Sequence, residues 1–170
     1  LGYSGWSTSN YLNRASDADW DVLGTGAATM SIWVKSTGNA TYEDLFSISN
    51  SGASRKMNLE IATNGTLSSV VIGATATVVS NSTTVIDDSV WHKIDFVRES
   101  STSLKMYVDG VLEDTSTTDQ GSLSDSGNIP LGIGINANGS SYPATSSTLA
   151  LARFSATAPS ATQVRQMYDA

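Results

Sequence analysis

Carboxylates are the side chains with the clearest catalytic potential in this sequence of 170 residues. Hydrolysis of a glycosidic bond needs two of them, one on each side of the scissile bond. The four glutamates each lack a second carboxylate two residues away: Glu43, Glu60, Glu99 and Glu113. Asp95 and Glu99 share one face of an expected strand, but four strand residues separate them by roughly 13 Å, too far for either glycosidase geometry. The acidic residues therefore argue against an enzyme.

The chain has one histidine and no cysteine. A catalytic triad or a histidine metal centre would have to be built on His92, which belongs to an alternating pattern with Ile94 and Phe96. We expect His92 to be a packed or capping residue of that strand. The lack of cysteine removes disulfides and thiolate metal sites.

Three aspartates at alternate positions form the segment best suited to a metal ion. Asp17, Asp19 and Asp21 offer the hard oxygen ligands that calcium prefers. However, Val22 stands where an EF-hand loop needs glycine, and Ala28 stands where it needs glutamate. We expect a solvated acidic loop with no metal site, and no cofactor beyond weak calcium binding.

The net charge argues against another class of partner. Nine lysines and arginines are outnumbered by sixteen acidic residues, which gives a formal charge of −7. The basic residues are scattered along the chain, whereas binding to nucleic-acid phosphates needs a basic stripe or patch. The sequence also has no apolar run long enough to cross a membrane. We therefore expect neither nucleic-acid binding nor membrane insertion.

Aromatic rings beside amides and hydroxyls are the remaining functional groups. A sugar is recognised when an aromatic ring stacks on its apolar face and polar groups around the ring form hydrogen bonds. The candidate ligand-binding residues in the polar loops are Trp20, Tyr42, Asn136, Asn138 and Tyr142. For each ring the alternative is packing against the edge of its own sheet.

Short segments with alternating apolar residues must position these loops. In the clearest segment, 90–115, Asp109-Gly110 suits a two-residue type I′ turn between strands, because both central positions need positive φ. Further strands are predicted at 28–35, 45–49, 57–62, 67–72, 76–80, 129–135 and 149–154. Ser160 and Gln163 can form the capping box of one helix. The pattern predicts an all-β fold, a two-sheet antiparallel jelly-roll sandwich with one short C-terminal helix, as a single domain over residues 1–170.

Three segments of the chain resemble the concanavalin A-like, laminin-G-like jelly-roll superfamily, in its bacterial or phage form. They are ATMSIWVK at 28–35, VWHKIDFVRESSTSLKMYVDGVLED at 90–114 and LALARFSATAPSATQVRQMYDA at 149–170. The resemblance implies the same sandwich, with His92 in a structural strand. Many members carry an acidic residue in the closing strand, sometimes near calcium, where this chain has Ala150. A metal site of that type is therefore not expected.

The resemblance and the side chains together predict a non-catalytic, lectin-like recognition module that binds surface carbohydrate. The expected partners are a glycan or other cell-surface ligand and the other domains of a longer parent protein. The expected location is extracellular or on a virion surface, within a secreted or phage structural protein. The alternative is a structural or protein–protein interaction module that decorates a larger assembly.

Overall fold

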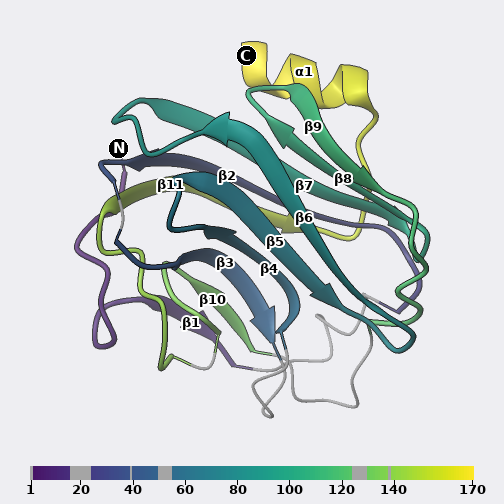
Figure 1. Ribbon diagram of the computed structural model, residues 1–170, viewed down its shortest axis with the longest axis horizontal. Coiled ribbons are helices and arrows are strands. Elements are labelled where there is room, and N and C mark those ends of the chain that lie inside the picture. The colour runs from purple at the N-terminus through teal and green to yellow at the C-terminus, as the bar shows by residue number, and fades with distance from the viewer. Residues whose placement is uncertain (1, 16–23, 39, 50–54, 124–129, 138) are drawn as a thin grey trace.

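The computed structural model describes residues 2–15, 24–38, 40–49, 55–123, 130–137 and 139–170. Within these ranges, the chain forms two antiparallel sheets and one helix (Figure 1). The six-stranded sheet has, in spatial order, β1 (Leu12–Arg14), β10 (Leu131–Ile133), β3 (Glu43–Ser49), β4 (Arg55–Ile61), β5 (Thr66–Ile72) and β6 (Thr77–Val85). The five-stranded sheet has β11 (Ser147–Ser155), β2 (Ala28–Ser36), β7 (Trp91–Ser100), β8 (Ser103–Val108) and β9 (Val111–Ser116). This arrangement confirms the predicted jelly-roll sandwich.

The predicted meander forms the middle and one edge of the five-stranded sheet. Alternation places Ile94 and Phe96 of β7 on the inner face, and both are completely buried. In the turn between β8 and β9, Asp109 has φ 52° and Gly110 has φ 74°, which confirms the type I′ geometry. The turn fixes the register in which β8 pairs with β9.

The main core lies between the inner faces of the two sheets. The apolar side chains that fill it from both sheets include Met30, Ile32, Val34, Phe46, Ile48, Met57, Leu59, Ile61, Ile94, Phe96, Leu104 and Met106. The ring of Trp6, from the N-terminal segment, closes one end against Gly134. A Cβ at Gly134 would lie 2.1 Å from that ring, so only glycine allows this packing.

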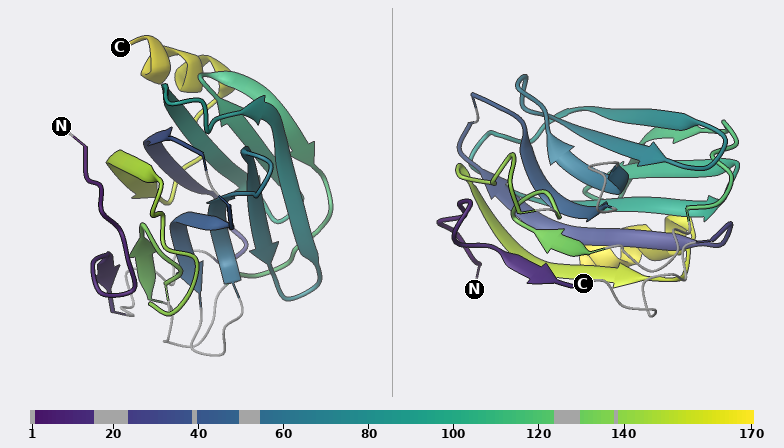
Figure 2. Two further views of the ribbon diagram at one scale, coloured as in Figure 1. Left: turned by 60° about the vertical axis from the view of Figure 1, so that its left-hand side comes forward. Right: turned by 90° about the horizontal axis from the view of Figure 1, so that it is seen from below.

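The helix α1 (Ala161–Asp169) lies outside the sandwich, as Figure 2 shows. Ser160 caps it, and the predicted capping box with Gln163 is present. Val164 is buried against Val97 and Tyr107, two residues on the outer face of the five-stranded sheet. The helix therefore covers part of that face.

The strand predicted at 129–135 is shorter in the structure. The described strand β10 covers Leu131–Ile133, because Gly134 takes φ 77° and turns the chain away. The backbone of Ala137 then passes close to Gly132, where a Cβ would meet the Ala137 Cα at 2.8 Å. This close approach, which glycine permits, brings the long β10–β11 loop back onto the sheet.

Candidate functional site

Two tyrosines predicted as ligand contacts meet in space although one hundred residues separate them. Tyr42 directly precedes β3, and Tyr142 belongs to the β10–β11 loop. Their ring centroids lie 6.3 Å apart, with an angle of 74° between the planes. Each residue is 42% exposed. We call this pair the aromatic ridge.

Backbone hydrogen bonds fix the loop that carries Tyr142. The Asp44 amide donates to the Tyr142 carbonyl (2.8 Å), and the Ala144 amide donates to the Gly134 carbonyl (2.9 Å). Tyr142 itself has φ 56°, a conformation that persists in a non-glycine residue only where the surroundings impose it. The ridge is thus held by the fold before any ligand arrives.

Glu43 fastens the far end of the same loop. Its carboxylate is buried and accepts hydrogen bonds from the Ser146 amide (2.7 Å), the Thr145 hydroxyl (3.1 Å) and the Ser147 hydroxyl (2.7 Å). The spacing of residues around Glu43 does not indicate this role, because its partners lie about a hundred residues further along the chain. A carboxylate held in this way braces a loop rather than acting on a ligand.

Asn136, a third predicted ligand contact, is 5% exposed and lies inside this loop. Its backbone amide donates to the Ser141 carbonyl (3.2 Å), and its carbonyl accepts from the Gly139 amide (2.7 Å). In this position Asn136 shapes the loop beneath the ridge. Trp20 and Asn138, the other two candidates, lie outside the described residues.

A pair of buried carboxylates, which the sequence analysis did not identify, lies next to the ridge. Asp44 and Glu60 are opposite each other on β3 and β4. The Asn58 amide nitrogen donates to both, at 2.7 Å to Asp44 Oδ1 and 3.1 Å to Glu60 Oε2, while its oxygen accepts from the Val70 amide (3.0 Å). Both acidic residues are at most 3% exposed, whereas a glycosidase pair must face its substrate. The arrangement fits a structural network.

The lone histidine is held between two aspartates. His92 Nδ1 lies 2.7 Å from Asp109 Oδ2, and Nε2 lies 3.2 Å from Asp88 Oδ1. The same Asp109 accepts the Lys93 backbone amide (2.8 Å). The Val90 amide, and then the His92 ring, lower the pKa of Asp88. Nδ1 thus joins the start of β7 to the β8–β9 turn, and Nε2 joins it to the segment that precedes β7. These contacts confirm the expected structural role of His92.

The described residues contain no group of three or more side chains that could hold a metal ion. Asp17, Asp19 and Asp21, the segment considered for calcium, lie outside the described residues. The one described helix is too short to cross a membrane.

The sequence matches the family model described as the concanavalin A-like lectin/glucanases superfamily over residues 7–165. A search of curated proteins gives no match. The chain is similar to a solved structure of Ruminococcus gnavus IT-sialidase CBM40 bound to alpha2,3 sialyllactose, with 14% identity and a TM-score of 0.74, over 99% of this chain and 98% of that one.

Two further solved structures share the architecture. The native heptameric SAP-like pentraxin from Limulus polyphemus is 15% identical with a TM-score of 0.68, over 98% of this chain and 80% of that one. The binding domain of botulinum neurotoxin DC in complex with SialylT is 10% identical with a TM-score of 0.63. That match covers 90% of this chain, which spans 37% of the toxin structure's length. At these identities the likeness shows the fold.

Proposed function

Because the chain belongs to the concanavalin A-like lectin/glucanases superfamily, we propose that it is a non-catalytic module that binds surface carbohydrate through the aromatic ridge. The observation that carries the proposal is the pair of half-exposed rings, Tyr42 beside β3 and Tyr142 on a loop that backbone hydrogen bonds hold against β3. The similar CBM40 structure holds a sialylated glycan, which supports this class of ligand. We place the module outside the cell or on a virion, within a longer protein.

The geometry of the ridge suits a sugar. Rings at 74° to each other form a corner, so one face can stack on the apolar side of a pyranose while the other ring borders it. The two phenol hydroxyls can exchange hydrogen bonds with sugar hydroxyls. Because the loop is already fixed, binding has little ordering cost to overcome.

A glycan array tests the proposal with matched variants. Wild type should bind some glycans saturably, and Tyr142→Ala and Tyr42→Ala should each weaken that binding by several-fold to about tenfold, as expected for loss of one aromatic contact. Tyr168→Ala is the control: the Tyr168 ring stacks on Trp33 (5.9 Å), on the other sheet's outer face, and this variant should bind as wild type. Binding that survives both ridge substitutions would exclude the ridge as the contact surface.

A second candidate function is a structural or protein–protein module, and an apolar edge favours it. Tyr3, Leu12 and Leu151 are exposed beside a shallow groove between the N-terminal segment and β11, and Leu151 is 79% exposed. Such a patch suits contact with a neighbouring domain of the parent protein. An array with no saturable binding for the wild type would favour this function over the first.

A further inference from the structure

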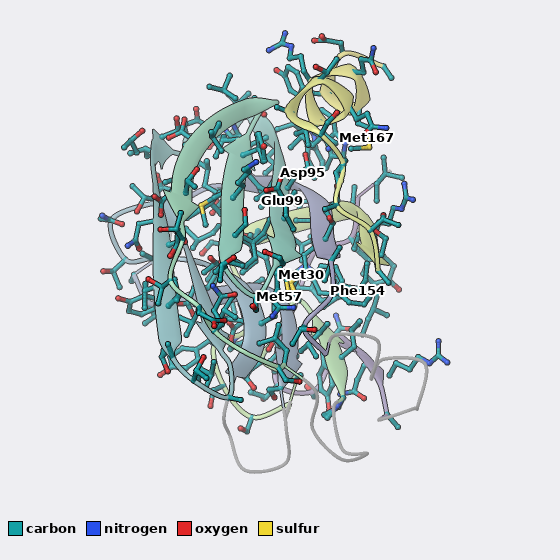
Figure 3. The ribbon with its side chains drawn as sticks, turned by 90° about the vertical axis from the view of Figure 1, so that its right-hand side faces the viewer. Met30, Met57, Asp95, Glu99, Phe154 and Met167 are labelled. Atoms are coloured by element: carbon teal, nitrogen blue, oxygen red, sulfur yellow. The ribbon has the colours of Figure 1, made fainter. Side chains whose placement is uncertain are left out.

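A cavity of about 560 Å³ lies between α1 and the outer face of the five-stranded sheet. Strands β2, β7 and β11 form its floor, while residues 157–159 and the helix form its wall. Figure 3 shows Asp95 of the floor and Met167 of the helix near each other at the helix end of the sheet. The volume falls within the range of small-molecule sites. The aromatic ridge contributes no residue to it.

A row of side chains crosses the floor of this cavity. Strand pairing sets Arg153 of β11 opposite Ser31 of β2, and Ser31 opposite Asp95 of β7. Residues paired in this way point to the same face. Two strand spacings place the Arg153 and Asp95 Cα atoms about 10 Å apart, with the Ser31 hydroxyl between them. A basic group and an acidic group thus flank a hydroxyl in one line.

Asp95 has an unused acceptor at the floor. The residue is completely buried, and its Oδ2 forms an ion pair with Lys93 Nζ. Its Oδ1 is buried and has no hydrogen-bond partner among the residues that the structure describes. A buried carboxylate oxygen without a donor is unfavourable, so a ligand that brings a donor to Oδ1 gains that interaction. Because Lys93 already neutralises the carboxylate, a neutral hydroxyl suits Oδ1 better than a second cation.

Arg153 supplies the opposite charge at the rim. Its side chain is exposed, and over the described part of the chain its guanidinium forms no ion pair or hydrogen bond. A guanidinium binds a carboxylate with two parallel hydrogen bonds. The rest of the lining is rich in hydroxyls and amides: Thr29, Ser155, Thr157, Gln163 and Gln166. The Gln163 side-chain oxygen accepts the Ser160 amide (2.8 Å), which fixes the orientation of its amide group.

We propose that this cavity is a second binding site, for a small polyhydroxylated carboxylate such as an acidic sugar. The ligand's carboxylate pairs with Arg153, one of its hydroxyls donates to Asp95 Oδ1, and the lining amides and hydroxyls bind the rest. The site goes beyond the proposed function and does not depend on Tyr42 or Tyr142. A single sugar ring held in this way binds at about millimolar dissociation constants.

Titration of the 170-residue chain with glucuronate, glucose and acetate, followed by NMR, tests the site. Glucuronate should bind at millimolar concentrations, and glucose and acetate should each bind at least about tenfold more weakly, because each lacks one of the two anchoring groups. The chemical-shift changes caused by glucuronate should fall on residues of α1 and β11. Glucuronate that does not bind, or acetate that binds as well as glucuronate, would overturn the proposal.

Substitutions at exposed positions separate the groups without disturbing the core. Arg153→Gln should reduce the affinity for glucuronate to the affinity for glucose. A charge at position 166 should act on the ligand's carboxylate, so Gln166→Glu should weaken glucuronate binding and Gln166→Arg should strengthen it. Arg165→Gln is the control, since Arg165 pairs with Asp169 (2.8 Å) outside the cavity, and it should change nothing. Glucuronate binding that persists unchanged in Arg153→Gln contradicts the assignment.

The floor acceptor has its own variant. Asp95→Asn should also weaken the binding of glucuronate. Because this substitution leaves Lys93 without its ion-pair partner, a melting curve must first show that the variant is folded. If Asp95→Asn does not fold, the Arg153 and Gln166 variants decide the outcome. The two sites are separate if Tyr142→Ala loses binding on the glycan array but still binds glucuronate. Arg153→Gln should then lose glucuronate binding but keep its binding on the array.

Discussion

Glu113 joins the open edges of the two sheets, and its removal gives a sharp test of how the sandwich is closed. It lies on β9, the last strand of one sheet, and reaches β6, the last strand of the other. Its Oε2 accepts the Thr83 amide (2.9 Å), the Thr83 hydroxyl (2.5 Å) and the Thr84 amide (3.2 Å), and its Oε1 accepts the Thr84 hydroxyl (2.7 Å). Burial would raise the pKa of Glu113, but these donors outweigh it and hold the pKa below its ordinary value of 4.5.

Glu113→Gln keeps the shape of the side chain but removes its charge. The new NH₂ group is a donor and would face the amides and hydroxyls of Thr83 and Thr84, which are also donors. Hydrogen bonds to a charged group contribute about 1.5–3 kcal/mol to stability. Water can reach this edge and replace part of the loss, so we expect a reduction of about 2 kcal/mol in the free energy of unfolding. For a chain of this size that corresponds to a fall in Tm of about 4–8 °C.

The effect should depend on pH in one direction. Because the folded-state pKa of Glu113 is below the unfolded one, its stabilisation is present above the ordinary value of 4.5 and is lost as pH falls through the folded value. In urea unfolding, the difference between the free energies of unfolding of wild type and Glu113→Gln should therefore be largest at neutral pH. The two values should become equal at acid pH.

Glu99→Gln provides the control for this experiment. Glu99 is a carboxylate on the outer face, paired with Lys105 (2.6 Å) and Ser103 (2.6 Å), and its loss should cost less than about 1 kcal/mol. If wild type and Glu113→Gln have equal urea midpoints at neutral pH, Glu113 does not stabilise the fold by joining β9 to β6. A difference between the midpoints that stays the same at acid pH would contradict that role as well.

Further substitutions test other parts of the fold. Phe96→Ala should cost about 3–5 kcal/mol in urea unfolding, and a loss below about 1 kcal/mol would contradict its place in the core. Gly110→Val should lower Tm markedly, since φ is 74° and an added Cβ would lie 3.1 Å from the Arg165 Cα; a melt equal to wild type would contradict the turn. Ser160→Ala should cost about 1 kcal/mol through loss of the helix cap, and unchanged helix stability by hydrogen exchange would exclude that role. Millimolar calcium should leave Tm unchanged; a rise of several degrees, abolished by Asp19→Asn, would show a tight site.

Much of the fold was predictable because alternation along a strand reports which face is buried. The β7–β8–β9 meander follows from its apolar spacing and from Asp109-Gly110, and α1 follows from Ser160 and Gln163. Strand ends were less predictable. The early end of β10 depends on the turn at Gly134, which packs against the Trp6 ring from a distant segment.

The candidate site was predictable only in its residue types. Tyr42 and Tyr142 were chosen as loop aromatics, but their contact depends on how the β10–β11 loop folds back onto β3. The bracing by Glu43 and the Asp44–Asn58–Glu60 network arise from pairing between separate segments, and spacing along one strand cannot reveal such pairs. A ligand role for Trp20 and Asn138 stays a prediction.

The most direct test of carbohydrate binding at the aromatic ridge is an NMR titration of the tyrosine ring resonances with a glycan identified on the array. We predict that the Tyr42 and Tyr142 ring signals shift together along one saturating curve, while the Tyr168 signal stays fixed. Saturable glycan binding that leaves both ridge signals unmoved would contradict the account.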